Sequence, residues 1–285
     1  MIQPDDPGVY ARSCLRCGLD EGMGENRLCA TCCPPERGPG WELRLGKFQD
    51  VLADVERCDA VITDPPYLSA CASAGGSWAV GARHSAVGES PMGYEPASES
   101  LLDDLVSFAA RICSGWFVAF NDFDGAHYVR SAVRSRGAVS AEPIAWVKPK
   151  CLTPPRGANN LPEKGTEFII ASRFKPLARN GLIPGSYVSP TNTPGPNQSL
   201  FVTGGKPIDL MRAIVRDFTK PGDLIVEPFS GGGTTLLAAV MEGRRAIGAE
   251  MDAGRFEIAV KRLRKGYTTS LFAEHEAEMK QEVLF

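Results

Sequence analysis

The stretch LIVEPFSGGGTTLLAAVMEGRRAIGAE, residues 224–250, decides the fold. It begins with a short apolar run, Leu224–Val226, which predicts a buried strand. Three glycines, Gly231–Gly233, form the turn that follows, and the apolar segment Leu236–Met241 predicts a helix. A second strand covers Arg245–Ala249 and ends at an acid, Glu250. The stretch therefore predicts a β-loop-α-β unit, the building block of an α/β fold.

The glycine turn and the acid after the second strand predict a ligand site. Glycines at a strand-to-helix turn let a ligand approach the backbone at the carboxyl edge of the sheet, although such a turn can also serve packing alone. An acid at the position of Glu250, 17 residues beyond Gly233, can accept hydrogen bonds from the hydroxyls of a ribose. The turn lacks the Lys-Ser/Thr pair of a phosphate-binding loop and the strict G-x-G-x-x-G spacing. We therefore expect a nucleoside ligand rather than ATP or NAD.

A second stretch, VITDPPY at residues 61–67, has the composition of a site at a strand end. Proline cannot donate to a sheet, so the strand stops at Pro65. The residue before a proline is held extended, which fixes Asp64. The strand end would present a carboxylate, backbone carbonyls and the Tyr67 ring to one spot, the groups needed to hold a planar molecule that carries an amine. The plainer alternative is a proline-rich loop in which Tyr67 only packs.

Strands and helices alternate along the rest of the chain, which predicts a mostly parallel sheet with helices on both faces. The remaining strands are expected at 41–45, up to residue 64, 116–120, 144–147 and 167–171. The remaining helices are expected at about 48–56, from 101 to 112, 124–134, 207–218 and about 253–265.

Composition is that of a soluble globular protein, and the odd number of cysteines without a secretory signal predicts a reducing compartment such as the cytoplasm. Of its 285 residues 43% are hydrophobic and 23% charged, which is ordinary for that class. No run of eighteen apolar residues predicts a membrane span, and the first residues do not resemble a secretory signal. The net charge of −3 gives no overall attraction to nucleic acid, so a local basic surface would have to supply it. One basic irregular segment, 148–179, could hold phosphates or could be a solvated loop.

Five of the nine cysteines lie within the first 33 residues. Two Cys-x-x-Cys pairs separated by eleven residues are typical of a tetrahedral structural zinc site, although redox or idle thiols are the alternative. The expected ligands are Cys14, Cys17, Cys29 and Cys32, with Cys33 as an alternative to Cys32. We expect residues 1–40 to form a zinc-ribbon-like module and linker that unfolds without Zn²⁺.

DPPY at 64–67 and EPFSGGGTT at 227–235 together resemble the catalytic and cofactor motifs of amino-group (N6-adenine or N4-cytosine) DNA methyltransferases. The catalytic motif comes first, as in the β-type order of that family. The resemblance covers roughly residues 42–264 and implies a Rossmann-like fold that binds S-adenosyl-L-methionine and double-stranded DNA. It implies catalytic roles for Asp64, Pro65, Pro66 and Tyr67. It implies cofactor contacts for Lys206, Glu227, Pro228, Phe229, Gly231, Gly233, Thr234 and Glu250.

By this resemblance Asp64 and the Pro65 carbonyl accept hydrogen bonds from the exocyclic amine, and Tyr67 stacks on a base flipped out of the duplex. Two departures stand out. Gly46-Lys47 replaces the usual Gly-Asp near the first strand, and Glu227 stands where relatives often have Asp. Asp at the first position of the tetrapeptide is more typical of adenine-N6 than of cytosine-N4 enzymes.

The resemblance divides the remainder of the chain. The methyltransferase domain is expected at 41–270, with a lid or flexible loop at 68–99 and a short target-recognition segment at 174–203. A segment this short predicts either loose sequence specificity or specificity completed by the cysteine module or by a second subunit. The tail, 271–285, ends in Gln281–Phe285, which is similar to the peptide that docks on the replication sliding clamp but can equally be an accidental amphipathic end.

Several functions stay open. The first is adenine-N6 methylation of DNA, as in restriction-modification systems, with cytosine-N4 methylation as its close alternative. A catalytically weak zinc-ribbon DNA-binding subunit is another, since Lys47 departs from the family pattern. Methylation of RNA or of a protein amide is a third.

Overall fold

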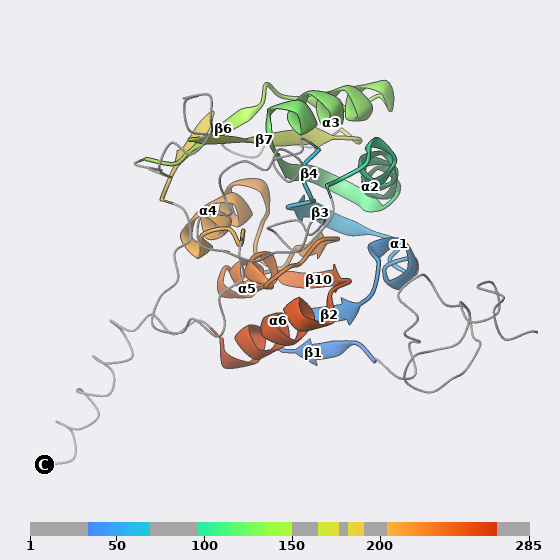
Figure 1. Ribbon diagram of the computed structural model, residues 1–285, viewed down its shortest axis with the longest axis vertical. Coiled ribbons are helices and arrows are strands. Elements are labelled where there is room, and N and C mark those ends of the chain that lie inside the picture. The colour runs from blue at the N-terminus through green and yellow to red at the C-terminus, as the bar shows by residue number, and fades with distance from the viewer. Residues whose placement is uncertain (1–33, 69–95, 150–164, 177–181, 191–203, 267–285) are drawn as a thin grey trace, which may run out of the picture.

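A computed structural model describes residues 34–68, 96–149, 165–176, 182–190 and 204–266 of the chain (Figure 1). The predicted zinc ligands Cys14, Cys17, Cys29 and Cys32 lie outside these residues, as does the tail with Gln281–Phe285. Most of the predicted lid and part of the predicted target-recognition segment also lie outside them. Among the described residues, no helix is both long and apolar enough to cross a bilayer.

One mixed sheet forms the centre of the molecule, with the strand order β1-β2-β10-β9-β3-β4-β7-β6-β8 and β5 paired to β7. The strands are β1 (Glu36–Gly38), β2 (Trp41–Leu45), β3 (Cys58–Thr63), β4 (Cys113–Asn121), β5 (Val139–Ser140), β6 (Ile144–Val147), β7 (Thr166–Arg173), β8 (Ser186–Val188), β9 (Leu224–Glu227) and β10 (Arg245–Glu250). The strands from β2 to β4 in this order are parallel, whereas β7 is antiparallel to both β4 and β6. The prediction of a mostly parallel sheet therefore holds from β2 to β4, whereas every pairing of β7 is antiparallel, and β6 and β8 are again parallel to each other.

Helices cover both faces of the sheet, as predicted (Figure 1). They are α1 (Phe48–Val51), α2 (Glu99–Ile112), α3 (Phe123–Ser135), α4 (Ile208–Phe218), α5 (Thr234–Met241) and α6 (Ala253–Lys265). The buried side chains of α1, α2 and α3 form one apolar core with one face of the sheet, and those of α4, α5 and α6 form another on the opposite face. The two cores hold the sheet rigid, so its strand ends are fixed in space.

Local sequence explains where the helices begin. The side chains of Ser98, Asp122 and Asp252 each accept a hydrogen bond from the backbone N–H three residues on, at 3.1, 2.8 and 2.7 Å. These bonds satisfy donors that the first turn of α2, α3 or α6 would leave unpaired. Ser98, Asp122 and Asp252 are therefore the N-cap residues of these helices, and the expected boundaries of the three helices are correct to within two residues.

Helix α1 is shorter than predicted and ends at Val51 rather than near Glu56. Arg44, on the neighbouring strand β2, donates a hydrogen bond of 2.6 Å to the carbonyl oxygen of Val51. That carbonyl is one that another helical turn would use, and the guanidinium satisfies it instead. A contact across the fold thus stops a helix that the local pattern would extend.

Candidate functional site

The candidate site lies where β3 and β9 run side by side. These parallel neighbours pair Ala60 with Ile225 and Val61 with Val226, although the strands are far apart in sequence. The helix that follows β3 in the chain packs on one face of the sheet, and the helix that follows β9 packs on the other. The carboxyl ends of β3 and β9 therefore lie at a topological switch point, the place where open α/β sheets bind ligands.

A buried hydrogen bond joins the two predicted motifs at this point. The Thr63 hydroxyl, directly before Asp64, donates to Glu227 Oε1 at 2.6 Å across a separation of 164 residues. Glu227 also accepts hydrogen bonds from the Thr235 hydroxyl at 2.8 Å and from the Phe229 N–H at 2.9 Å. Glu227 is 1% exposed, so its carboxyl group organises the glycine turn from inside the protein.

Burial gives Glu227 an unusual affinity for a proton. Desolvation raises the pKa of its carboxyl group to about 8, against the bonds from Thr63, Phe229 and Thr235, which favour the ionised form. The Glu227 oxygens face these protein donors, so the residue holds the glycine turn in place, and its predicted contact with a cofactor stays a prediction.

The glycine turn has the conformation that its sequence predicts. Gly231 and Gly233 have φ angles of 50° and 75°, in the left-handed region that favours glycine. A side chain added at Gly231 would meet open space, whereas one at Gly233 would lie 3.1 Å from Ala259 Cβ on α6. Gly231 thus leaves room for a ligand at the backbone, and Gly233 lets α5 and α6 pack.

The other predicted cofactor residues surround this turn. Glu250 accepts hydrogen bonds from the N–H groups of Gly231 and Asp252, at 2.7 and 2.8 Å. Burial raises the pKa of Glu250, and these two bonds oppose the shift. A carboxylate has about four acceptor positions, so two remain for the hydroxyls of a ligand. The half-buried Phe229 ring packs edge-on against Phe48 with 5.2 Å between centroids.

Thr234 and Pro228 belong to the same turn. Thr234 is buried, and its hydroxyl receives a hydrogen bond of 3.1 Å from Arg262, which also donates to the Gly232 carbonyl. Pro228 is buried directly after Glu227. Both residues are therefore buried parts of the glycine turn that help to maintain its conformation.

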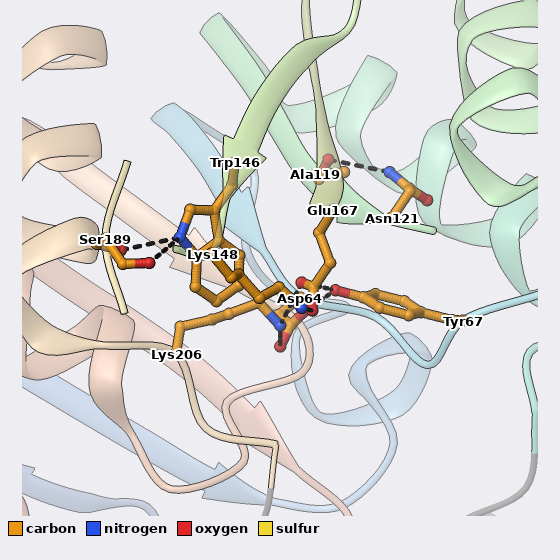
Figure 2. A network of polar contacts seen from close by, with 9 residues as sticks. All are labelled: Asp64, Tyr67, Ala119, Asn121, Trp146, Lys148, Glu167, Ser189 and Lys206. Carbon is orange, nitrogen blue, oxygen red and sulfur yellow. Dashed lines mark hydrogen bonds and ion pairs between the residues drawn. The ribbon is translucent and has the colours of Figure 1, made fainter. Parts of the chain in front are cut away.

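The predicted catalytic residues follow β3 without regular structure, as two prolines require. Pro65 is buried, whereas Asp64, Pro66 and Tyr67 are partly exposed. The Tyr67 hydroxyl lies 3.3 Å from Asp64 Oδ1 and donates a shorter bond of 2.5 Å to Glu167 Oε2 (Figure 2). The Tyr67 ring is thereby held beside the Asp64 carboxylate.

The Lys206 ammonium pairs with the Asp64 carboxylate rather than lying beside the glycine turn. Its Nζ is 2.5 Å from Asp64 Oδ2 and 3.4 Å from Glu167 Oε2 (Figure 2). The ammonium also lies over the rings of Tyr67, Phe120 and Trp146, at 5.3, 5.0 and 5.8 Å from their centroids. Lys206, which the sequence predicts as a cofactor contact, therefore lies with the predicted catalytic residues. Carboxylates and aromatic faces there both stabilise its charge.

Sequence reasoning missed Glu167 and Lys148. Glu167 opposes Trp146 in the antiparallel pair of β7 and β6, and Lys148 Nζ reaches Glu167 Oε1 at 2.5 Å. Their charges were visible only as part of an irregular basic segment. The one available signal was their place at the ends of two predicted strands, without any spacing that linked them to Asp64.

The ionisation of the two carboxylates differs because their surroundings differ. Burial raises the pKa of Asp64, Lys206 opposes this shift, and the charge of Glu167 adds to it. Burial would also raise the pKa of Glu167, but Lys206 and Lys148 outweigh it and hold that pKa below its ordinary value. Glu167 is therefore a firm anion, while the charge of Asp64 depends on Lys206.

In the part of the chain that the structure describes, no group of three or more His, Cys, Asp or Glu side chains could hold a metal ion.

The sequence matches a family model described as DNA methylase over residues 185–261, which include Lys206, the glycine turn and Glu250. This match and the relatives with similar sequences support the amino-group DNA methyltransferase family. Its sequence is 45% identical over 58 residues to the Type II methyltransferase M.HindIII of Haemophilus influenzae. This match covers 20% of the chain and 19% of that protein, so it spans about a fifth of the relative's length.

Solved structures agree with the fold. The chain resembles the M1.HpyAVI–SAM complex with a TM-score of 0.57 and 23% identity, over 78% of this chain and 98% of that one. It resembles the cytosine-N4-specific PvuII DNA methyltransferase with a TM-score of 0.53 and 19% identity, over 80% and 94% of the two chains. At these identities the likeness concerns the fold of S-adenosylmethionine-dependent DNA methyltransferases.

Proposed function

We propose that the chain transfers a methyl group from S-adenosyl-L-methionine to the exocyclic N6 amine of adenine in double-stranded DNA. The observation that carries the proposal is the hydrogen bond from Thr63 to Glu227, which joins the DPPY strand end to the glycine turn. A group that binds amines and a turn that accommodates a nucleoside thus open onto the same switch point.

The residues at the glycine turn fit the cofactor. Gly231 faces open space with its backbone exposed to a ligand, and Glu250 retains acceptor capacity for two ribose hydroxyls. When bound, S-adenosylmethionine supplies an electrophilic methyl group on a sulfonium. Gly231, Gly233, Phe229 and Glu250 would hold its nucleoside end, with Glu227, Pro228 and Thr234 maintaining the turn.

The chain's own residues prepare the acceptor. Asp64 and the Pro65 carbonyl accept hydrogen bonds from the target amine and orient its lone pair, a gain in proximity and orientation. Tyr67 offers a ring on which the flipped base stacks, which offsets on the order of 1–3 kcal/mol of lost stacking in the duplex. Pro65 and Pro66 hold these groups rigid because neither proline can join a sheet or a helix.

Identification of the product tests the proposal. The protein is incubated with labelled cofactor and several duplex DNAs, and the digested nucleosides are separated by mass spectrometry. We expect N6-methyldeoxyadenosine. N4-methyldeoxycytidine would assign the alternative base, and cofactor binding without any methylated nucleoside would indicate a non-catalytic subunit. RNA and protein substrates in competition would show whether DNA is the preferred acceptor.

Substitution at Asp64 tests the assignment of the site. Asp64→Ala should lower transfer by about a hundredfold or more, the scale seen when one preorganised polar contact is lost at a reacting group. Cofactor affinity should persist because the glycine turn is intact. Unchanged turnover would refute the role of Asp64.

The cysteine module and the further partners remain proposals from sequence alone. We propose that Cys14, Cys17, Cys29 and Cys32 hold one structural Zn²⁺. Docking of Gln281–Phe285 on a sliding clamp, and pairing with a second copy of the chain, are expectations of the same kind.

A further inference from the structure

Four side chains of alternating charge form a continuous chain behind the catalytic strand end. Lys148 contacts Glu167 at 2.5 Å, Glu167 lies 3.4 Å from Lys206, and Lys206 contacts Asp64 at 2.5 Å (Figure 2). The exposed fractions of these side chains are 10%, 17%, 7% and 26%, so the opening to solvent is at the Asp64 end. We call these four residues the charge chain.

The charge chain is a costly arrangement for stability alone. Removing charged groups from water is unfavourable, and apolar side chains of similar volume are often at least as stabilising. The sheet around it is already well packed, with Phe120 and Ile169 fully buried. A role in stability therefore explains the charge chain poorly, and its open end at Asp64 directs attention to the reacting amine.

Lys206 by itself would not define the position of the Asp64 carboxylate. A lysine ammonium sits on a flexible stem and has no fixed hydrogen-bond geometry. Glu167 restrains it from a second direction, and the same carboxylate receives the Tyr67 hydroxyl at 2.5 Å. One side chain therefore orients both the cation on Asp64 and the ring beside Asp64.

Glu167 also disfavours the ionised form of Asp64, and Lys148 counteracts this effect. A second carboxylate close to Asp64 disfavours its ionised form, and a protonated Asp64 would lose one acceptor for the amine. Lys148 pairs with Glu167 from the far side, so the four charges cancel and the cation between the carboxylates stays available to Asp64.

We infer that Glu167 is a positioning residue that holds Lys206 and Tyr67 beside Asp64, and that Lys148, by pairing with Glu167, leaves Lys206 available to keep Asp64 an anionic acceptor for the target amine. This inference rests on the proposed function, since it names further residues of the same site. Glu167 is a positioning residue because it acts through Lys206 and Tyr67.

The inference predicts opposite effects of two substitutions on the pH dependence. The charged or titratable groups that face Asp64 are Lys206 from the segment before α4, Glu167 from β7, Tyr67 from its own loop and Glu227 from β9, with Lys148 behind Glu167. Ionised Asp64 is the stronger acceptor for the amine, so activity should fall as the pH drops through its pKa.

Glu167→Gln removes a negative neighbour and leaves Lys206 entirely to Asp64. The acidic limb of the pH profile should therefore move to lower pH. Lys148→Met leaves Glu167 without its far-side partner, so Glu167 competes more strongly for Lys206 and the limb should move to higher pH. Each displacement should be on the order of one pH unit, the lower end of what a charge within 4–6 Å produces.

The experiment measures single-turnover methyl transfer against pH at saturating cofactor. Glu167→Gln should also lower kcat about tenfold, because an amide restrains Lys206 more weakly, while KM for cofactor and DNA stays within about threefold. Matched controls are Glu142→Gln, which removes an exposed carboxylate paired with Arg130, and Lys261→Met, which removes an exposed lysine. Both controls should leave the profile unchanged. Urea unfolding verifies that every variant is folded.

A second readout does not require turnover. ¹³C-carboxyl NMR of the ligand-free chain follows the titration of Asp64 directly, with the resonance assigned through Asp64→Asn. Displacements of the Asp64 midpoint in opposite directions support the inference. Equal displacements, or none in either variant, overturn it. If the wild-type protein methylates no DNA, the proposed function fails, and the NMR titration still decides whether Glu167 and Lys148 control Asp64.

Discussion

Glu227→Gln tests whether the acid at the start of the glycine turn carries a proton. Glutamine has the same shape, and its amide can pair with Thr63, Thr235 and the Phe229 N–H, the three partners of the carboxyl group. The substitution therefore removes the titration of residue 227 and leaves the packing of the turn almost unchanged.

The sign of the effect follows from the direction of the pKa shift. Burial raises the pKa of Glu227 from 4.5 to about 8, so between these values the folded protein holds a proton that the unfolded chain releases. Wild-type stability therefore falls as the pH rises through this window, by up to roughly 5 kcal/mol in all at 1.36 kcal/mol per unit. Glutamine has no such dependence.

The assay is urea unfolding followed by circular dichroism at pH 5, 7 and 9, with both proteins measured at each pH. Other groups titrate alike in the two proteins, so the difference in unfolding free energy isolates residue 227. Glu227→Gln should gain roughly 2–4 kcal/mol on wild type between pH 5 and pH 9. A difference that stays constant over this range would refute the reasoning, because it would mean that Glu227 is ionised throughout.

Three further predictions concern packing, the tyrosine hydroxyl and the metal. Gly248→Ala would place a Cβ 2.2 Å from Ser230 Oγ and 2.9 Å from Leu236 Cδ1. This substitution should lower the unfolding free energy by about 1–3 kcal/mol, or Tm by roughly 2–10 °C, and weaken cofactor binding. In the control variant Gly185→Ala, the added Cβ meets nothing within 4 Å and should change Tm little. Equal Tm values for the two variants would contradict this packing argument. Tyr67→Phe keeps the stacking ring but removes the hydrogen bond to Glu167. We expect kcat to fall about tenfold, the loss expected for a hydrogen bond to a charged group, with KM for DNA nearly unchanged. A rise in KM alone would mean that the hydroxyl serves binding. Metal analysis should find about one Zn per chain, reduced by Cys14→Ser and by chelators; a chain without zinc would remove the ribbon-like module.

Most of the fold could be predicted from local sequence because each element has a pattern that depends only on near neighbours. The strand ending at Asp64 and the β-loop-α-β unit up to Glu250 lie where their apolar runs predict them. Helix α6 and strand β6 match their expected bounds to the residue. The antiparallel pairings of β7 could not be foreseen, since the sequence of a strand does not indicate the direction of the strand beside it.

The sequence by itself determined the two motifs, their order and the chemical groups that Asp64, Tyr67 and the glycine turn contain. Spacing and residue type suffice there because each motif acts through adjacent residues. Only the tertiary structure decided that Lys206 lies on Asp64, 142 residues away, and that Tyr67 meets Glu167 across 100 residues. These contacts follow from the placement of β9 beside β3 and of β7 beside β4, which depends on the packing of the whole sheet. The charge chain therefore has no signature in the sequence, because its four members come from four segments that only the fold brings together.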